Sequence, residues 1–459
     1  MNKINLDGIK KIHFIGIGGS GMFPLAQIMQ AKGFIISGSD ISDSETLEKV
    51  EKLGIKIYHS HQPSNVQNAD CVVYSAAIKE DNPEIQTAKA KNIPIIKRSE
   101  LMGWIFNCYK CSIGVSGTHG KTTTTSMITS ILIDAQKDPT AIIGGTLPKI
   151  NSNSHVGKSE IIVGEACEYT DSFLCLHPAI AVITNVDEDH LDYFKNFENL
   201  KKSFSKYASQ TTKLIVANGD DSPSLECIEN SQAQKVLFGF KPSNDFYAKD
   251  LTFNKQQFAS FSIFHKETKL TDISLHVPGK HNVYNALAAF AVCYEIGINS
   301  NVIKSSLEQF GGAHRRFEFL YSQNNITVAD DFAHHPTELS NTLQTAMNMG
   351  FNNVWAVFQP HTFSRTFMLL NDFVKALSIA DKVIISDILP VRETNKWGVK
   401  STDLTSKIPQ SFYIPTFEEI SDFLLNNVKP GDLIITLGGG DVYKCANLIV
   451  KKLSDKYST

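Results

Sequence analysis

A lysine-bearing glycine loop carries the clearest chemistry in this sequence. Residues 117–123 read Gly-Thr-His-Gly-Lys-Thr-Thr and lie between an apolar run of strand length and a helical segment. Glycines let backbone N–H groups approach phosphate oxygens, Lys121 can reach the β- and γ-phosphates of a nucleotide, and the Thr122 hydroxyl can bind Mg²⁺. The usual P-loop pattern has a glycine where Val115 stands, but the groups that handle phosphate are present. The segment predicts an ATP site formed by Gly117, Thr118, His119, Gly120, Lys121, Thr122 and Thr123.

A second glycine loop lies near the N-terminus. Gly16, Gly18 and Gly21 follow the G-x-G-x-x-G spacing, directly after an apolar run and at the start of a helical segment, and Asp40 ends the next apolar run. Such a loop brings backbone N–H groups and the positive end of a helix to a pyrophosphate. NAD, FAD or any nucleotide diphosphate would fit it. Two phosphate loops in one chain predict two phosphorylated ligands, which argues against a simple dehydrogenase and against a simple ATPase.

Two further polar residues, Glu165 and His190, each follow an apolar run in the block that contains the lysine-bearing loop. The carboxyl ends of parallel strands share one edge of a sheet with the phosphate loop, so both side chains are expected to face ATP. On chemical grounds alone His190 is equally a general base or a hydrogen-bonded core residue, because Mg²⁺ prefers oxygen ligands. Asp187 and Asp189 beside it either support a metal site or belong to a solvated loop.

Parallel β-sheets must position these residues. Apolar runs of strand length alternate with segments of helical period along the chain, which is the pattern of an α/β fold with crossover helices. The alternation divides into three blocks and predicts three domains, 1–107, 108–312 and 313–459. The first and third are expected to be Rossmann-like. The central one is expected to be a P-loop ATPase-type parallel sheet with a small antiparallel part at 245–277, where aromatic and polar residues alternate.

The apolar runs and helical periods also give approximate bounds for the elements. Helices are expected at 22–31, at 282–296 and around 370–377. Strands are expected at 11–17, 34–37, 71–75, 111–116, 160–164, 179–184, 213–217, 354–358, 382–386 and 432–437.

Composition excludes several classes of protein. Lys and Arg total 44 against 47 Asp and Glu, a net charge of −3, so no general positive field exists to hold nucleic acid, and phosphate binding must be local. No apolar run approaches the roughly 18 residues that span a bilayer. Glycines interrupt the apolar stretch 13–26, so neither membrane insertion nor a signal peptide is expected. The eight cysteines are scattered, which favours reduced thiols and a cytoplasmic location.

Nine segments, in this order and spacing, resemble the Mur ligases, a family of ATP-dependent ligases of bacterial cell-wall synthesis. The similarity runs essentially from end to end of the chain. The segments are HFIGIGGSGM (13–22), SGSD (37–40), GTHGKTTTT (117–125), EACEYTDSF (165–173), TNVDEDHLDYF (184–194), GKHNVYNALAA (279–289), RRFE (315–318), DDFAHHPTE (330–338) and FQPHTFSRT (358–366).

The resemblance implies an enzyme of peptidoglycan precursor synthesis with one ligand class for each domain. The first domain would hold a UDP-sugar, the central domain ATP, and the third domain an amino acid. The implied reaction joins L-alanine to the carboxylate of UDP-N-acetylmuramate through an acyl phosphate, with ATP as co-substrate and Mg²⁺ at two sites. The chain would act as a monomer or homodimer, and closing of the third domain onto the second would complete the nucleotide site.

The resemblance also assigns roles to residues. The first glycine loop would hold the UDP pyrophosphate rather than a redox cofactor, and Glu165 and His190 would join Thr122 as Mg²⁺ ligands. His61 is alternatively an ordinary surface histidine, and the amides that open the helix at 282 alternatively only cap it. The implied UDP-sugar residues are Gly16, Gly18, Gly19, Ser20, Gly21, Asp40, His61 and Ser75, and the further ATP residues are His281, Asn282, Asn285, Arg316 and Asp331.

The implied amino-acid side lies in the third domain. His361 and Arg365 follow a predicted strand, and Arg365 could pair with the alanine carboxylate through two hydrogen bonds. His334, with its neighbour His335, would orient or deprotonate the amine, unless the two are a plain loop pair. Related sequences often place an arginine where Thr362 stands, so one substrate contact is in question. With Lys121, the implied catalytic set is Lys121, His334, His361 and Arg365.

Three alternatives stay open at the level of sequence. Within the family, some members join a whole tripeptide to the same UDP-sugar, although the segment 165–178 is more similar to the alanine enzymes. Outside it, the N-terminal loop could serve an NAD-dependent oxidoreductase, which predicts nicotinamide binding and no ATP turnover. The third alternative is a nucleotide-gated binding protein that hydrolyses ATP slowly without forming a bond.

Overall fold

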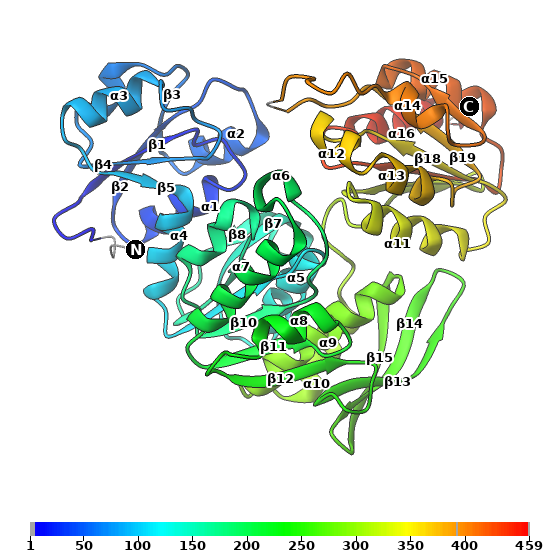
Figure 1. The fold of residues 1–459 in the computed structure, drawn as a ribbon, viewed down its shortest axis with the longest axis horizontal. Helices are drawn as coiled ribbons and strands as arrows, with labels where there is room; N and C mark the ends of the chain where they lie inside the picture. The colour runs from blue at the N-terminus through cyan, green and yellow to red at the C-terminus, as the bar shows by residue number, and fades with distance from the viewer. Residues whose placement is uncertain (1–4, 392, 458–459) are drawn as a thin grey trace. The chain divides into compact units, whose positions relative to one another are not determined.

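The protein has an α/β fold, described by a computed structural model of residues 5–391 and 393–457. Three sheets of five, ten and six strands form the framework, and helices pack on their faces (Figure 1). The chain forms two compact units, Met1–Tyr247 with Leu287–Ile303, and Ala248–Ala286 with Lys304–Thr459. The α/β class and the mostly parallel sheets predicted from the sequence are confirmed.

The five-stranded sheet of the first unit is entirely parallel. Its order is β3-β2-β1-β4-β5, and every neighbouring pair runs in the same direction. The carboxyl ends of its strands therefore lie at one edge, where sheets of this kind bind ligands. The elements are β1 (Lys11–Ile15), α1 (Phe23–Ala31), β2 (Ile35–Ser39), α2 (Glu45–Lys52), β3 (Lys56–Tyr58), η1 (Pro63–Val66), β4 (Cys71–Tyr74), α3 (Pro83–Ala90), β5 (Ile95–Lys97) and α4 (Arg98–Asn107).

The central sheet has seven parallel strands in the order β13-β12-β11-β10-β6-β9-β7, where β13 is Phe246–Phe253, and β8 pairs antiparallel to β7 at the edge. Strands β6 and β10 are apolar along most of their length because helices cover both faces. The elements are β6 (Cys111–Ser116), α5 (Lys121–Asp134), β7 (Thr140–Leu147), η2 (Pro148–Ile150), β8 (Ser152–His155), β9 (Ile161–Glu165), η3 (Tyr169–Cys175), β10 (Ile180–Ile183), α6 (Leu191–Phe194), α7 (Phe197–Gln210), β11 (Leu214–Asn218), α8 (Ser222–Ile228), β12 (Gln234–Gly239), α9 (Lys280–Glu295) and α10 (Ser300–Glu308).

Within the first unit, the five-stranded sheet and the central sheet are tightly joined. A Cβ added to Gly103 of α4 would lie 2.1 Å from the backbone oxygen of Cys175, so α4 packs directly on η3. The Asn153 side chain donates a hydrogen bond to the backbone oxygen of Ser20 (2.9 Å). One apolar core contains Met102 and Phe106 of α4 together with residues of the central sheet. The first glycine loop is therefore anchored to the edge of the central sheet.

The second unit contains an antiparallel hairpin and the six-stranded sheet. Strands β14 (Phe258–His265) and β15 (Thr268–Pro278) pair antiparallel beside β13 (Phe246–Phe253), which confirms the antiparallel part expected at 245–277. The six-stranded sheet has the order β16-β17-β21-β18-β19-β20 and is parallel except for β16. Its elements are β16 (Glu318–Gln323), β17 (Ile326–Asp331), α11 (Pro336–Met347), β18 (Val354–Phe358), α12 (Phe363–Met368), α13 (Leu370–Leu377), β19 (Lys382–Ile385), α14 (Ser401–Thr405), β20 (Ser411–Tyr413), α15 (Phe417–Asn427), β21 (Leu433–Leu437) and α16 (Tyr443–Tyr457).

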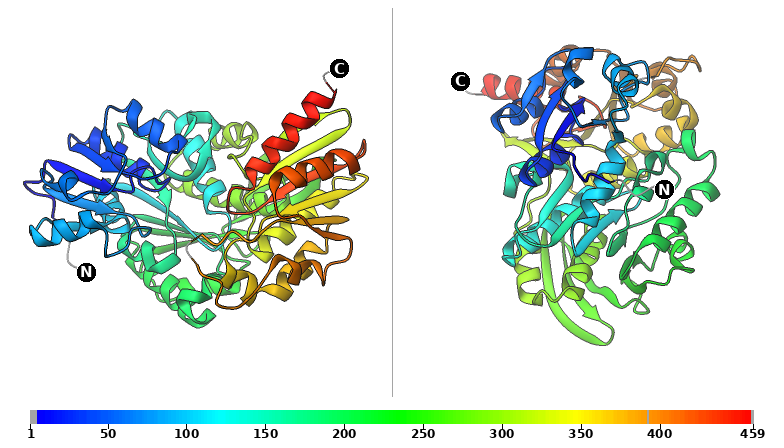
Figure 2. Two further views of the ribbon diagram at one scale, coloured as in Figure 1. Left: turned by 90° about the horizontal axis from the view of Figure 1, so that it is seen from above. Right: turned by 90° about the vertical axis from the view of Figure 1, so that its left-hand side faces the viewer.

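Separate apolar cores fill the two faces of the six-stranded sheet. On one face, Leu339 and Leu343 of α11 and Phe373 of α13 pack against the strands. On the other, α15 and α16 pack beside each other on the sheet, with Leu424 and Ile449 in the same core (Figure 2). The sheet is thus covered on both sides, as the Rossmann-like prediction requires.

Most predicted strand bounds agree with the structure to within two residues. The predicted strands 111–116 and 354–358 match β6 and β18 residue for residue. Glu165 was expected just after a strand, but it is the last residue of β9, because its backbone is still in register with Val115 of β6. The helix expected from 282 begins two residues earlier, at Lys280.

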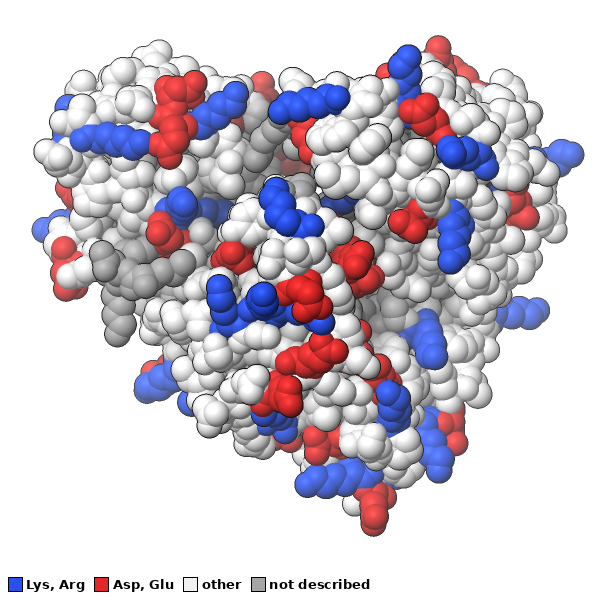
Figure 3. Space-filling model, viewed as in Figure 1, with Lys and Arg blue, Asp and Glu red and all other residues white. Residues whose placement is uncertain are grey.

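The surface carries charges of both signs. Lysine and arginine side chains alternate with aspartate and glutamate over the face shown in Figure 3, in keeping with the net charge of −3. Through residues 5–391 and 393–457, the structure contains no helix with both the length and the apolarity to cross a membrane.

Candidate active site

The lysine-bearing loop connects β6 to α5, and two of its glycines adopt conformations that other residues avoid. Gly117 has φ +131° and Gly120 has φ +84°. A Cβ on Gly117 would lie only 2.0 Å from Oγ1 of Thr184, so space as well as backbone angle requires glycine there. The loop predicted from the sequence therefore has the tight backbone that a phosphate cradle needs.

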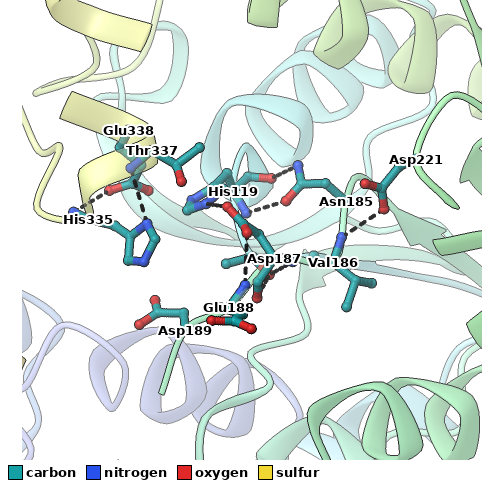
Figure 4. Close-up of polar contacts among 12 residues, drawn as sticks. His119, Asn185, Val186, Asp187, Glu188, Asp189, Asp221, His335, Thr337 and Glu338 are labelled. Carbon is teal, nitrogen blue, oxygen red and sulfur yellow. Dashed lines mark hydrogen bonds and ion pairs between the residues drawn. The ribbon is translucent and has the colours of Figure 1, made fainter. Parts of the chain in front are cut away.

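The segment after β10 braces this loop (Figure 4). The His119 N–H donates to Oδ1 of Asn185 (2.9 Å), and the Asn185 side chain donates back to the His119 backbone oxygen (3.0 Å). The Asp187 N–H donates to the Thr118 hydroxyl (2.9 Å), and the Asp187 carboxylate lies 3.3 Å from Nε2 of His119. Asp187 thus holds the lysine-bearing loop in place. The sequence suggested instead that it supports a metal site or belongs to a solvated loop.

Lys121 is held in place by a buried carboxylate. Its Nζ donates to both carboxylate oxygens of Glu168 (3.0 and 3.1 Å) and to the backbone oxygens of Gly117 (2.5 Å) and Thr118 (3.1 Å). The Glu168 side chain is only 2% exposed. Although burial favours the neutral amine, the charge of Glu168 raises the pKa of Lys121 above its usual value, so Lys121 stays an ammonium. The role of Glu168 is not predicted by the sequence, although Glu168 stands three residues after Glu165.

Glu165 and His190 lie beside this ion pair. The Glu165 carboxylate accepts the backbone N–H of Gly144 (2.5 Å), and its charge also acts on Lys121. His190 has φ +55°, its Nε2 lies 3.7 Å from Glu168 Oε1, and its ring packs on Tyr169 with 4.6 Å between centroids. Carboxylate oxygens and a hydroxyl such as that of Thr122 are donors of the kind that Mg²⁺ prefers. His190 is the less usual donor in that set.

The N-terminal glycine loop is shaped by residues at the ends of neighbouring strands. Gly16 has φ +80°, and its N–H donates to the backbone oxygen of Ser39 (2.7 Å). One carboxylate oxygen of Asp40 accepts the Gly18 N–H (2.9 Å), and the other accepts the N–H and hydroxyl of Ser42. Asp40, expected near uridine, therefore holds the loop in shape through both of its oxygens. The Ser75 hydroxyl packs against Gly16.

His61 belongs to a buried polar network rather than to the open surface. Its Nδ1 lies 3.0 Å from both Ser39 Oγ and Glu84 Oε2. The fully buried Glu84 also accepts hydrogen bonds from Ser39 (2.6 Å) and Asn65 (2.7 Å), and Nε2 of His13 lies 3.5 Å away. Burial alone would raise the pKa of Glu84, but these partners outweigh it and lower the pKa to about 2. The surface alternative for His61 is therefore wrong.

Replacing Glu84 by glutamine is expected to lower the free energy of unfolding by about 3 kcal/mol at pH 7, because 1.36 kcal/mol accompanies each pKa unit. A carboxylate whose folded pKa is depressed from 4.5 to about 2 stabilises the protein above pH 4.5 and loses that contribution as the pH falls through 2. Urea unfolding at pH 7 and pH 3 measures the difference in free energy of unfolding between wild type and variant. This difference should be smaller at pH 3. Glu80→Gln, at an exposed ion pair with Lys89, is the control and should change little. If the difference in free energy of unfolding were equal at both pH values, the ionised carboxylate of Glu84 could not be its source.

In the second unit, Asp331 shapes the segment after β17. Its carboxylate accepts the N–H groups of Phe317 (2.8 Å) and Ala333 (2.7 Å). Burial raises the pKa of Asp331 to about 6, against the attraction of the Arg316 charge. The neighbouring Arg315 supports the fold instead. It pairs with Asp330, and it donates hydrogen bonds to the backbone oxygens of Gly438 and Gly440, which follow β21.

The residues predicted to bind the amino-acid substrate follow the carboxyl ends of two strands: His334 follows β17, and His361 and Arg365 follow β18. The rings of His334 and His361 lie 5.6 Å apart, centroid to centroid. Burial lowers the pKa of His361 to about 4, helped by the charges of His334 and Arg365. Thr362 has φ +69°, unusual for a β-branched residue, and its hydroxyl accepts the Arg365 N–H at the start of α12. Among the described residues, Nδ1 of His361 is buried without a hydrogen-bond partner.

Other predicted residues support local structure. Nδ1 of His335 accepts the Thr337 N–H and so caps α11, with Glu338 completing a capping box (Figure 4). The Asn282 amide donates to the Pro278 backbone oxygen (2.8 Å), and the Asn285 amide donates to Asn282 (3.0 Å). Both asparagines are buried, and the His281 ring packs against Gly279. These contacts tie the start of α9 to the residues before it, and the roles predicted for His281, Asn282 and Asn285 stay predictions.

The chain is similar to Mur ligases along its length. The model of the Mur ligase family catalytic domain matches residues 11–110, that of the Mur ligase middle domain matches 115–293, and that of the Mur ligase glutamate ligase domain matches 315–440. A protein of Acetivibrio thermocellus named UDP-N-acetylmuramate–L-alanine ligase is 46% identical over 449 residues, which cover 96% of each chain. These three matches in chain order confirm the three-domain organisation.

Solved structures give the same picture. The crystal structure of a UDP-N-acetylmuramate-alanine ligase from Thermotoga maritima is 29% identical, with a TM-score of 0.82 over 97% of this chain and 99% of that one. A murein peptide ligase from Psychrobacter arcticus is 23% identical, with a TM-score of 0.75 over 98% and 99%, and shares the fold. With three family models in order and a 46% identical relative along nearly all of its length, this chain belongs to the Mur ligase family.

Proposed function

We propose that this protein is an ATP-dependent ligase that joins L-alanine to the carboxylate of UDP-N-acetylmuramate, in peptidoglycan precursor synthesis. The observation that carries the proposal is the 46% identity, over 96% of both chains, to a relative named for that reaction. The tripeptide-ligating alternative has less support, since the murein peptide ligase is 23% identical. The oxidoreductase alternative does not account for the lysine-bearing loop.

The chemistry requires activation of a poor electrophile. Transfer of the γ-phosphoryl group of ATP to the sugar carboxylate makes an acyl phosphate, which the amino group of alanine then attacks. Charge develops on the transferring phosphoryl group, so a cation such as Lys121 stabilises the transition state. Mg²⁺, at one or two sites, would supply further charge neutralisation. Thr122, Glu165 and His190 are the proposed ligands, and Glu168 holds Lys121 beside them.

The remaining assignments follow the same reaction. The N-terminal glycine loop would bind the UDP diphosphate, while His281, Asn282, Asn285, Arg316 and Asp331 would serve ATP. Arg365 would bind the alanine carboxylate. His334 would orient or deprotonate the alanine amine. His361 would face the amino acid as a neutral ring, because burial lowers its pKa to about 4. The domain division at 107 and 312, a cytoplasmic location and a monomeric or dimeric state complete the proposal.

Phosphate release tests the proposal directly. The protein is mixed with Mg-ATP and UDP-N-acetylmuramate, and L-alanine, L-serine, glycine or the tripeptide is then added separately. Phosphate equal to the amide formed, with alanine as the best substrate, is the expected result. Turnover that needs the tripeptide would replace the proposal by the recycling activity. Phosphate release without any amino acid would favour slow hydrolysis by a binding protein.

A further inference from the structure

Arg98 is a cation that the proposed mechanism does not use. It is the first residue of α4, directly after β5, so it lies at the carboxyl edge of the five-stranded sheet, the edge that also carries the first glycine loop. A Cβ on Gly21 would lie 3.3 Å from a terminal nitrogen of Arg98 and 3.6 Å from its central guanidinium carbon. The guanidinium therefore lies directly against the last glycine of the loop.

An open pocket of about 130 Å³ adjoins this guanidinium. On one side it is lined by Ser20 and Gly21 of the loop and by Arg98 and Met102 of α4, and on the other by Glu165 and Phe173 of the central part. It therefore leads from the loop proposed for the UDP-sugar to a residue proposed for Mg²⁺. All of these residues belong to the first compact unit.

The charge of Arg98 is not neutralised from within the protein. Over residues 5–391 and 393–457, its guanidinium makes no hydrogen bond or ion pair. Glu165, the carboxylate in the pocket lining, is bound by the Gly144 N–H instead. A half-buried guanidinium beside an anion-binding loop fits a bidentate oxyanion such as phosphate or carboxylate.

We propose that Arg98 binds an anionic group of the sugar nucleotide, either its diphosphate or the carboxylate of its sugar acid, across this pocket. The inference rests on the proposed function for the identity of the ligand. The glycine at position 21 leaves room for the guanidinium beside the loop. Arg98 would hold the sugar nucleotide at the entrance to the pocket, so that its reacting end points toward Glu165.

Calorimetric titration of wild type and Arg98→Met tests the proposal with three ligands: UDP, UDP-N-acetylglucosamine and UDP-N-acetylmuramate. Loss of a charge-assisted contact should weaken binding about 10- to 100-fold. Weaker binding of all three ligands supports the diphosphate as the group bound. Weaker binding of UDP-N-acetylmuramate alone supports the carboxylate, which the other two lack. Unchanged affinity for all three overturns the proposal.

Two control variants, and titration with ADP, distinguish loss of the Arg98 contact from a general loss of folding. Arg98→Lys keeps the charge but loses the forked donor and should lie between wild type and Arg98→Met. Lys97→Met removes a cation one residue earlier, outside the pocket lining, and should bind as wild type does. ADP with Mg²⁺ should bind Arg98→Met as it binds wild type, which shows an intact central site. If wild type itself binds none of the three UDP ligands, the proposed function fails, whereas failure of the Arg98 inference alone leaves wild-type binding in place.

Discussion

Replacing Lys121 by alanine is expected to lower kcat by about 10²- to 10³-fold, since one preformed cation at the transferring phosphoryl group is worth that much. Binding of UDP-N-acetylmuramate should persist, because the N-terminal glycine loop is built from other strands of the structure. Steady-state phosphate release measures the first effect, and calorimetric titration measures the second. Loss of both functions together would contradict the division into two anion sites.

The same substitution should also destabilise the protein, which needs its own control. Without Lys121, the carboxylate of Glu168 is left 2% exposed and without its ammonium partner. Breaking one side of a buried ion pair typically costs about 3–5 kcal/mol. Lys121→Ala combined with Glu168→Gln removes the stranded charge, so it should recover much of the lost thermal stability but none of the lost kcat. Recovery of turnover in the double variant would show that Lys121 acts only through folding.

The Lys121–Glu168 pair also implies a rearrangement on ATP binding. Nζ of Lys121 is occupied by two carboxylate oxygens and two backbone oxygens. Phosphate oxygens must replace some of these acceptors before the lysine can act on a nucleotide. Glu168 also lies near His190, one of the proposed metal ligands. Its carboxylate would therefore stay close to the proposed metal site after Lys121 leaves it.

Residues that act through a short local motif were predictable from the sequence. The spacing of Gly117, Gly120, Lys121 and Thr122 determines both the turn and the chemistry, and β6 and α5 bound the loop as expected. A proline at 336 and a glutamate at 338 are also a local signal, typical of the first turn of a helix, and α11 begins there. That His335 is the cap residue is seen only in the structure, because histidine is not a usual N-cap.

Residues that act through distant contacts were not predictable. Glu168 bonds a lysine 47 positions away, and Glu84 bonds His61 across 23 positions and Asn65 across 19. Arg98 meets Gly21 only because β5 and β1 end at the same edge of one sheet. Short strands such as β3, β5 and β20, of three residues each, contain too few positions to show any period. In each case the missing information is which segments lie next to one another in the fold, and a single sequence does not show that.

Gly117→Ala is expected to abolish ATP binding at concentrations that saturate wild type. The new methyl group would lie 2.0 Å from Oγ1 of Thr184, and φ +131° is itself unfavourable for alanine. Thr184 cannot simply move aside, because its hydroxyl donates to the backbone oxygens of His119 (2.6 Å) and Ser116 (3.2 Å). The loop must therefore shift away from the segment that braces it. Titration with Mg-ADP measures the loss.

Gly54→Ala supplies a control for the general effect of replacing a glycine of positive φ by alanine. Gly54 also has positive φ, +72°, but a Cβ there meets no heavy atom within 4 Å. It should therefore cost only the local backbone strain, roughly 1–2 kcal/mol of stability, and leave nucleotide binding and turnover at wild-type values. If Gly117→Ala bound Mg-ADP as well as Gly54→Ala does, the loop could not depend on its contact with Thr184. Binding lost in the first variant and kept in the second would locate the phosphate site at Gly117, because alanine at a positive-φ glycine without a close neighbour would then leave nucleotide binding intact.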